Sequence, residues 1–294
     1  MHDSHIHLAL EPLESKIDIV IENFLELGGK YILTQGTDIV DFKSTLDIAK
    51  KYPNIIQVAL GLHPTFFEEF TIQKGINKNL TAKIEKYVKE FEEIFKKEIK
   101  NISAVGETGL DYYQINLEKN IPKDIKEEIL QIQNDSFKNH ILLAMENNLP
   151  VSIHARDIQG KNSCVKDVIS MVAEMGKGTL RGSFHSYTGD IQYVDQILDL
   201  GFHIGFNAII TYNNGEDVRE IFKKTPVERI LFETDGPFLP PQSVRKNNKI
   251  KEKFAQPSDI KEIMEVAAEV KDVSFEYLER VTDENYSNLF NPPA

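Results

Sequence analysis

Residues 1–8 read Met1-His2-Asp3-Ser4-His5-Ile6-His7-Leu8, a strand-like run with two histidines at its end. Successive side chains of a β-strand point to opposite faces, so His5 and His7 share one face and can bind one cation, while Ile6 faces the other way. A His-x-His pair alone is weak evidence, because it arises by chance in long chains. The pattern gains meaning because strand-like runs that end in a histidine or a carboxylate recur along the chain.

Eight strand-like runs in all alternate with longer segments of helical period. The expected strands cover residues 1–7, 31–35, 55–60, 103–107, 149–154, 179–185, 202–206 and 229–233. Between them, apolar residues recur every three or four positions, which predicts amphipathic helices that pack on a sheet. Two such stripes are Phe137, Ile141, Ala144 and Met145, and Ile260, Ile263, Met264 and Ala267.

This alternation predicts an α/β fold with parallel strands. At 294 residues it favours a closed (β/α)8 TIM barrel, although the pattern alone leaves an open doubly wound sheet as an alternative. No linker-like stretch divides the chain, so we expect residues 1–294 to form a single domain. Gly28 and Gly29 are expected to end the first helix, and Gly176 the helix that follows Cys164.

The composition is 41% hydrophobic and 27% charged, with a formal net charge of −12. An acidic chain repels polyanions, which argues against nonspecific coating of nucleic acid. A phosphate substrate remains compatible, because bound divalent cations reverse the local charge. No apolar run reaches the roughly 18 residues of a membrane span. The single cysteine, Cys164, is expected to pack in the interior, and together with the absence of a signal-like segment it predicts a cytoplasmic protein.

Two stretches are rich in lysine. Residues 83–100 predict an amphipathic helix with a solvated face of mixed charge. Residues 242–253 show little periodicity and follow the last expected strand, so they form either an exposed loop or a phosphate contact beside the site. The basic residues of the second stretch are Arg245, Lys246, Lys249, Lys251 and Lys253.

Groups that can bind metals stand at or just after the ends of six expected strands. They are His5 and His7, His63, Glu107, His154, His185 and Asp235. In a barrel these ends meet at one rim, where catalytic residues gather. Imidazole and carboxylate ligands in this number suit two cations that share a ligand, with zinc, manganese, nickel, iron or magnesium as candidates.

Six motifs in a fixed order carry a family resemblance. They are Asp3-Ser4-His5-Ile6-His7, Gly61-Leu62-His63-Pro64, Gly106-Glu107-Thr108-Gly109-Leu110-Asp111-Tyr112, Leu149-Pro150-Val151-Ser152-Ile153-His154-Ala155-Arg156, His185-Ser186-Tyr187-Thr188-Gly189 and Glu233-Thr234-Asp235-Gly236-Pro237. Together they resemble the TatD family of metal-dependent DNases, which belongs to the amidohydrolase-like barrels. The resemblance covers essentially the whole chain.

The resemblance implies a ligand set and an activity. His5, His7 and Asp235 would hold one metal, His154 and His185 a second, and Glu107 would bridge the two. His63 and Arg156 would bind the substrate phosphate, and Asp235 and Glu107 would be the catalytic residues. The implied function is a deoxyribonuclease, either exo- or endonuclease, in which two divalent ions (Mg²⁺, Mn²⁺ or Zn²⁺) activate water and DNA is the substrate.

Other functions stay open at this point. The same barrel could act on an ester, an amide or a small phosphoester, because fold and metals do not name the substrate. A metal-stabilised binding protein without catalysis is a further alternative, against which Asp235 argues because the set leaves coordination positions free for water. The sequence leaves the oligomeric state undetermined and is compatible with a monomer.

Several nearby residues have less defined roles. Glu233 either supports a metal ligand or packs in the barrel. Asp111 and Tyr112 are expected to shape a loop rather than to act in catalysis. The chain departs from the usual family pattern at Tyr187 and at residues 254–257, which touch the substrate-binding rim and therefore bear on polymer preference.

Overall fold

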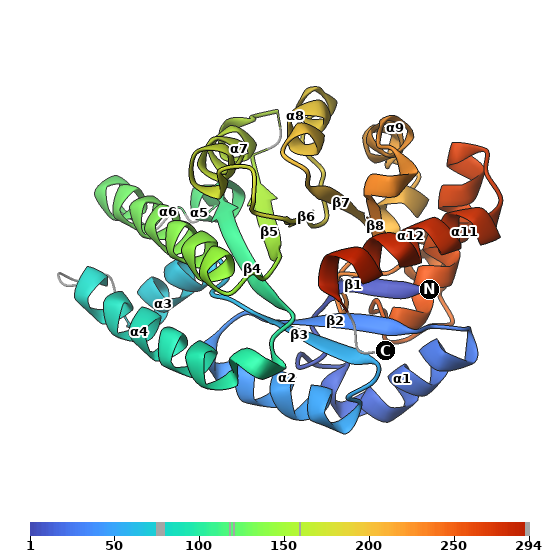
Figure 1. The fold of residues 1–294 in the computed structure, drawn as a ribbon, viewed down its shortest axis with the longest axis horizontal. Coiled ribbons are helices and arrows are strands. Elements are labelled where there is room, and N and C mark those ends of the chain that lie inside the picture. Colours follow the sequence, from blue (N-terminus) through green and yellow to red (C-terminus); the bar gives the residue numbers. More distant parts are fainter. Residues whose placement is uncertain (75–79, 118, 120, 159, 292–294) are drawn as a thin grey trace.

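The structure is a computed structural model that describes residues 1–74, 80–117, 119, 121–158 and 160–291. Eight parallel strands pair in the order β1 to β8, each with its neighbour along the chain. Figure 1 shows the helices arranged around the outside of these strands. The architecture is a (β/α)8 TIM barrel, and it confirms the expected fold class.

Each expected strand overlaps an observed one. The strands are β1 (His2–Ile6), β2 (Tyr31–Gly36), β3 (Ile56–Leu60), β4 (Ala104–Asp111), β5 (Val151–Arg156), β6 (Gly182–Phe184), β7 (His203–Phe206) and β8 (Ile230–Phe232). The main difference is β4, which continues four residues beyond the expected end at Glu107. Gly109, which lies beyond the expected end, is inside this strand.

The helices cover the outer face of the barrel. They are α1 (Ile17–Glu26), α2 (Ile39–Lys51), α3 (Phe66–Lys74), α4 (Leu80–Glu98), α5 (Tyr112–Leu117), α6 (Lys123–Glu146), α7 (Ser163–Gly176), α8 (Val194–Asp199), α9 (Glu216–Lys224), α10 (Gln242–Lys246), α11 (Ile260–Lys271) and α12 (Phe275–Phe290). Short 3-10 turns are η1 (Glu14–Lys16), η2 (Ile99–Asn101), η3 (Ile191–Tyr193), η4 (Ala208–Thr211), η5 (Val227–Arg229) and η6 (Pro257–Asp259). None of the helices in the described ranges combines the length and apolarity that a membrane crossing requires.

Both predicted apolar stripes face the core. All four stripe residues of α11 are buried, and so are Phe137, Ile141 and Ala144 of α6. The predicted lysine-rich helix is α4, which buries Phe91 and Phe95 against the barrel and leaves its charged face outside. The expected end of α7 at Gly176 is observed, but the left-handed residue that stops the helix is Lys177, with φ of 47°.

The seam between β8 and β1 is closed by backbone hydrogen bonds just beyond β8. Asp235 N donates to His5 O at 2.9 Å, and His7 N donates to Gly236 O at 2.8 Å. Beneath them, both the N–H and the hydroxyl of Thr234 donate to the buried carboxylate of Asp3, at 3.0 and 2.6 Å. Because of these bonds, the segment that carries Asp235 lies directly beside the two histidines of the first strand.

Helix α12 closes the amino-terminal end of the barrel. Tyr286 is fully buried, stacks on Tyr31 with ring centroids 5.8 Å apart, and donates its hydroxyl to Gln57 Oε1 at 3.0 Å. It packs with Phe290 and with inward side chains of four strands. The interior is therefore filled at this end, and the site must lie at the other.

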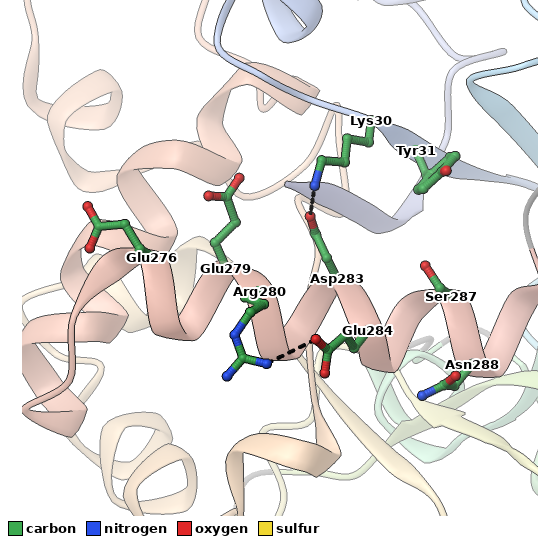
Figure 2. A pocket seen from close by; sticks show the side chains of 9 residues that line it. All are labelled: Lys30, Tyr31, Glu276, Glu279, Arg280, Asp283, Glu284, Ser287 and Asn288. Carbon is green, nitrogen blue, oxygen red and sulfur yellow. Dashed lines mark hydrogen bonds and ion pairs between the residues drawn. The ribbon is translucent and has the colours of Figure 1, made fainter. Parts of the chain in front are cut away.

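A hollow of about 670 Å³ lies on the outer side of α12, where β2 begins. Figure 2 shows that charged side chains of the helix line it and that Lys30 reaches down to Asp283. Lys30 Nζ donates to Asp283 at 2.8 Å, and His2 Nδ1 lies 3.0 Å from the same carboxylate. Arg280 pairs with Glu284 at 2.9 Å. The contacts of Asp283 tie α12 to the beginnings of the first two strands, whereas the Arg280–Glu284 pair lies within the helix.

Candidate metal centre

A cavity of about 810 Å³ lies at the carboxyl ends of the strands. All of the predicted site residues line it except His5, which lies fully buried beneath. The lining members of the predicted set are His7, His63, Glu107, His154, Arg156, His185 and Asp235. The structure therefore brings residues from six different strand ends to one place.

Glu107 stands at the centre of this group and is almost completely buried. Its Oε2 atom lies 3.2 Å from His5 Nε2 and 3.5 Å from His7 Nε2. Its Oε1 atom lies 2.8 Å from His154 Nδ1 and 2.7 Å from His185 Nε2. One carboxylate thus faces two sets of imidazoles, one set with each oxygen.

Asp235 completes the set around Oε2. Its Oδ1 atom lies 3.4 Å from His7 Nε2 and 3.8 Å from His5 Nε2. Asp235 adopts a left-handed backbone with φ of 55°, an uncommon conformation for a residue other than glycine. The hydrogen bonds of the seam hold this conformation, so the carboxylate is aimed at the histidines by the closure of the barrel.

His63 reaches the group from the loop between β3 and α3. Its Nε2 atom lies 3.1 Å from Glu107 Oε1 and 3.3 Å from His154 Nδ1. Its Nδ1 atom lies 2.7 Å from the hydroxyl of Thr65, which fixes the orientation of the ring. Three imidazoles therefore meet at one carboxylate oxygen.

The protonation states follow from burial and from the neighbouring charges. Burial alone would raise the pKa of Glu107, but the facing imidazoles of His185, His63 and His5 hold it well below its ordinary value. Burial, together with the facing His185, lowers the pKa of His5 to about 3. His5 is consequently neutral and presents a lone pair beside an ionised carboxylate, the pairing that a divalent cation requires of its ligands.

The donor atoms fit a cation by position as well. His5 Nε2 is buried and makes no hydrogen bond. Donor atoms within 4.8 Å of one another form three overlapping groups, namely His5, His7 and Asp235; His5, Glu107 and His185; and His63, Glu107 and His154. Nitrogen and oxygen donors of this kind match zinc, manganese or iron. The grouping differs from the one that the resemblance implies, because it places His63 with His154 and places His185 with His5.

Local backbone irregularities aim the ligands. The pairing of β1 with β2 shifts register between Asp3 and Ile6, around His5. The pairing of β4 with β5 shifts between Val105 and Thr108, around Glu107. Such shifts in a strand re-aim the side chain and are frequent beside functional sites.

Comparison with known proteins agrees with the geometry. The family model described as "TatD related DNase" matches residues 2–291. This chain belongs to the TatD family. It is 30% identical over 291 residues to the "Uncharacterized metal-dependent hydrolase YabD" of Bacillus subtilis, a match that covers 99% of this chain and 98% of YabD. It is 33% identical to the "Uncharacterized metal-dependent hydrolase BU355" of Buchnera aphidicola, with 98% of each chain covered.

A solved structure supports the same fold. The crystal structure of YjjV, described as a TatD homologue from Escherichia coli, superimposes with a TM-score of 0.79 at 21% identity. The match covers 100% of this chain and 98% of YjjV. At 21% identity the structural similarity shows a shared fold and does not show a shared substrate.

Arg156 lies at the end of β5 in this TatD-family protein, two residues after His154. Its side chain is exposed, lines the cavity, and places the guanidinium 4.1 Å from the ring centroid of Tyr113. The stacked ring restricts the arginine and keeps its charge over the cavity. Tyr113 was not among the predicted residues, and nothing in its spacing marks it, because the contact arises from the short helix α5.

Asp111 has two contacts, of which the sequence predicted one. Its Oδ1 accepts a hydrogen bond from Gln114 N at 2.6 Å, as expected of a residue that shapes a loop. Its Oδ2 also lies 3.0 Å from His154 Nε2. Burial alone would lower the pKa of His154, but the hydrogen bonds with Asp111 and Glu107 raise it to about 10. Tyr112 points elsewhere and donates its hydroxyl to Asp167 at 2.7 Å.

Ser152 contacts the ring of His5, whereas Glu233 lies near His185 without a hydrogen bond to it. Ser152 Oγ lies 3.0 Å from His5 Nδ1, the ring nitrogen that faces away from Glu107. Glu233 Oε1 lies 3.8 Å from His185 Nδ1, and its carboxylate accepts a hydrogen bond from Ser186 N. Ser152 could have been inferred from the sequence, since it lies two residues before His154 and so faces the same side of β5.

The remaining candidates lie outside the centre. Cys164 is buried in α7, where its thiol donates to Leu110 O at 3.2 Å, which agrees with the expected packing role. Of the predicted basic stretch, residues 242–246 form α10, and Arg245 stacks on Tyr212 at 4.1 Å. None of its five basic side chains is among the residues that line the cavity.

Proposed function

We propose that this TatD-family protein is a metal-dependent phosphodiesterase that hydrolyses DNA, with two divalent cations held on either side of Glu107. The observation that carries the proposal is the division of the carboxylate, with Oε2 toward His5 and His7 and Oε1 toward His154 and His185. A carboxylate shared in this way is suited to bridge two cations. The description of the matching family as a DNase and the names of the relatives as metal-dependent hydrolases support it.

In this proposal His5, His7 and Asp235 would hold one cation, His154 and His185 would hold the second, and Glu107 would be a ligand of both. When bound, the cations would lower the pKa of the attacking water and would neutralise charge on the phosphoryl oxygens. The ligands must lose their protons for this, and the neutral His5 already meets that condition. His154 must give up the proton that Asp111 and Glu107 stabilise.

The protein's own residues perform the rest of the reaction. The Asp235 carboxylate orients the attacking water and accepts its proton as the water oxygen bonds to phosphorus. The bond from phosphorus to the leaving sugar oxygen breaks in the same in-line displacement, and solvent protonates that oxygen. His63 and the Arg156 guanidinium bind the non-bridging oxygens of the phosphate and oppose the charge that grows on them.

A phosphodiester fits this cavity better than a neutral ester or amide. The exposed guanidinium of Arg156 and the ring of His63 lie beside the ligand cluster, where an anionic group would pair with them. With a net charge of −12, the protein attracts nucleic acid poorly as a whole, so we expect recognition to be confined to the site. Cys164 is a buried free thiol, and we place the protein in the reducing cytoplasm.

The test is an activity panel on protein purified without chelator. We expect cleavage of single- or double-stranded DNA with Mg²⁺, Mn²⁺ or Zn²⁺, loss of cleavage after treatment with EDTA, and recovery when the cation is returned. RNA, a chromogenic phosphodiester, a carboxylic ester and an amide complete the panel. Turnover of the ester or amide without turnover of any phosphodiester would overturn the proposal, and no turnover of anything would indicate a metal-stabilised binding protein.

A further inference from the structure

An exposed aromatic side chain stands at the edge of the metal centre. Phe238 follows Asp235 by three residues, lines the cavity, and is 52% exposed. Its ring centroid lies 5.8 Å from that of His7, and the two rings are inclined at 69°. A large apolar side chain in this position leaves one surface to the solvent directly beside the proposed reaction centre.

The loop that carries Phe238 is anchored on both sides. Phe238 N donates to Asp235 O at 3.0 Å, and Ala255 N donates to Pro237 O at 3.0 Å. Beyond the ring, the hydroxyl of Tyr212 donates to Pro240 O at 3.0 Å. Hydrogen bonds therefore hold the backbone on both sides of Phe238. The conformation of the loop keeps the ring at the cavity and exposed to solvent.

Other apolar side chains line the same cavity. They include Leu10, Val40, Ile209 and Leu239, and Val40 is 79% exposed. His63 and Arg156 contribute polar and charged lining to the same cavity. A ligand that fills such a space needs a flat apolar portion and an anionic portion. A nucleotide has both, in its base and its phosphate.

We propose that Phe238 is the stacking platform for the nucleobase next to the scissile phosphate. The inference rests on the proposed phosphodiesterase activity and specifies how the substrate is recognised. Every base offers a flat π face, so a single aromatic side chain binds DNA without strong sequence preference. The platform distinguishes a nucleic acid from a phosphodiester that carries no base.

Tryptophan substitution gives a direct binding readout. The sequence contains no tryptophan, so Phe238→Trp creates a single fluorophore at the platform. Titration with a phosphorothioate oligothymidylate should quench its emission, whereas an oligomer of the same length with abasic tetrahydrofuran units should leave it almost unchanged. The matched control is Tyr277→Trp on α12, an exposed aromatic position outside the cavity, whose emission should respond to neither oligomer.

Activity measurements supply the second arm. Phe238→Ala should lower kcat/KM on single-stranded DNA by about 10- to 100-fold, the range for loss of one stacked base. It should keep the wild-type metal content and should change cleavage of an oligomer with abasic units around the scissile phosphate very little. Phe238→Tyr should restore the rate, and Tyr277→Ala should behave as wild type.

The outcomes separate the two proposals. Equal cleavage of DNA by the wild type and by Phe238→Ala would overturn the platform while the phosphodiesterase stands, and so would equal quenching of Phe238→Trp by both oligomers. If the wild type cleaves no nucleic acid, the proposed function fails, and the fluorescence titration alone then decides whether Phe238 binds a base.

Discussion

Asp111 Oδ2 lies 3.0 Å from His154 Nε2, while the other ring nitrogen of His154 lies 2.8 Å from Glu107. A carboxylate on the far nitrogen of a ligating imidazole fixes the tautomer and the orientation of the ring and raises its basicity. The same Asp111 side chain also caps the backbone N–H of Gln114. Its two oxygens therefore serve two purposes that substitution can separate.

Asp111→Asn is expected to weaken metal binding by about 10- to 100-fold. Asparagine keeps an oxygen for Gln114 N but places an uncharged group against His154. Calorimetric titration with Mn²⁺ or Zn²⁺ measures the change. The control is Asp190→Asn, since Asp190 caps the backbone of Gln192 in the same way at 3.0 Å and is not among the residues that line the cavity. Unchanged affinity in Asp111→Asn, with a lower melting temperature, would leave Asp111 only its loop role.

Glu107→Ala and His63→Ala should differ in metal content. Removal of Glu107 takes away the group that faces both sets of imidazoles, so we expect loss of the metals and of activity. Removal of His63 should leave the metals in place and lower the rate, because we assign it to the substrate phosphate. Elemental analysis of both variants, alongside measured rates, tests this division of roles.

The control for these two variants is His203→Ala. His203 is a buried histidine of β7 outside the three donor groups, and its loss should reduce stability without releasing metal. His63 Nε2 lies 3.1 Å from Glu107 Oε1. At this distance His63 could itself be a metal ligand, so the metal content of His63→Ala tests its assignment directly. Metal loss in His63→Ala equal to that in Glu107→Ala would show that His63 is a ligand.

Gly109→Ala should damage the centre through the backbone. Gly109 has φ of 143°, and a Cβ atom added there would lie 2.0 Å from the carbonyl oxygen of His154. We expect the variant to lose about 2–4 kcal/mol of unfolding free energy and to bind metal poorly, because β5 must move. Chemical denaturation with a metal assay checks both effects.

Gly160→Ala is the matched control for that substitution. Gly160 also has a positive φ, of 76°, but apart from its chain neighbours no atom of the described residues lies within 4 Å of an added Cβ. It should lose only about 1–2 kcal/mol, the cost of the left-handed conformation, and should bind metal normally. A similar loss of metal in both variants would argue against the crowding at His154.

Asp283→Asn should reduce stability in a manner that depends on pH. Burial alone would raise the pKa of Asp283, but the hydrogen bond and charge of His2, the α-amino group and Lys30 hold it well below its ordinary value. A carboxylate with a lowered folded pKa stabilises the protein fully above its unfolded pKa of about 3.9 and loses this contribution as the pH falls toward the folded pKa.

We therefore expect the free energy of unfolding of Asp283→Asn to be about 1–3 kcal/mol lower than that of the wild type at pH 7. This difference between the two proteins should become smaller below about pH 4. Urea denaturation at several pH values measures it. Glu284→Gln removes a carboxylate that is 59% exposed from an ion pair with Arg280, and it should change stability by less than about 0.5 kcal/mol. A gap that stays constant with pH would contradict the role of the carboxylate.

Much of the fold could be predicted from the spacing of apolar residues and from the order of the strand-like and helical segments. Strand-like runs separated by helical stripes place all eight strands, and the position of each histidine or carboxylate at a strand end places it at the common rim. The full length of β4 could not be predicted in this way, because Gly109 lies two residues beyond the expected end at Glu107 and glycine is typical of a turn. In the structure Gly106 and Gly109 let β4 approach the backbone of β5 at Ser152 and His154.

The contacts behind the ligands depend on register, which a single sequence does not specify. Asp111 meets His154 only because β4 extends beyond its expected end and shifts its pairing with β5 between Val105 and Thr108. The packing of Tyr286 into the amino-terminal end is likewise set by where α12 docks. Residue types at strand ends thus predict which groups meet, whereas the shifts decide which atoms do.

The hydrogen bonds that join the last strand to the first have a consequence for assembly. Asp235 N bonds to His5 O, and His7 N bonds to Gly236 O, so three proposed cation ligands become neighbours only when the segment after β8 meets β1. A partly folded molecule in which that junction is still open has no complete cage for an ion. Tight retention of metal therefore reports that the first and last strands of the barrel have joined.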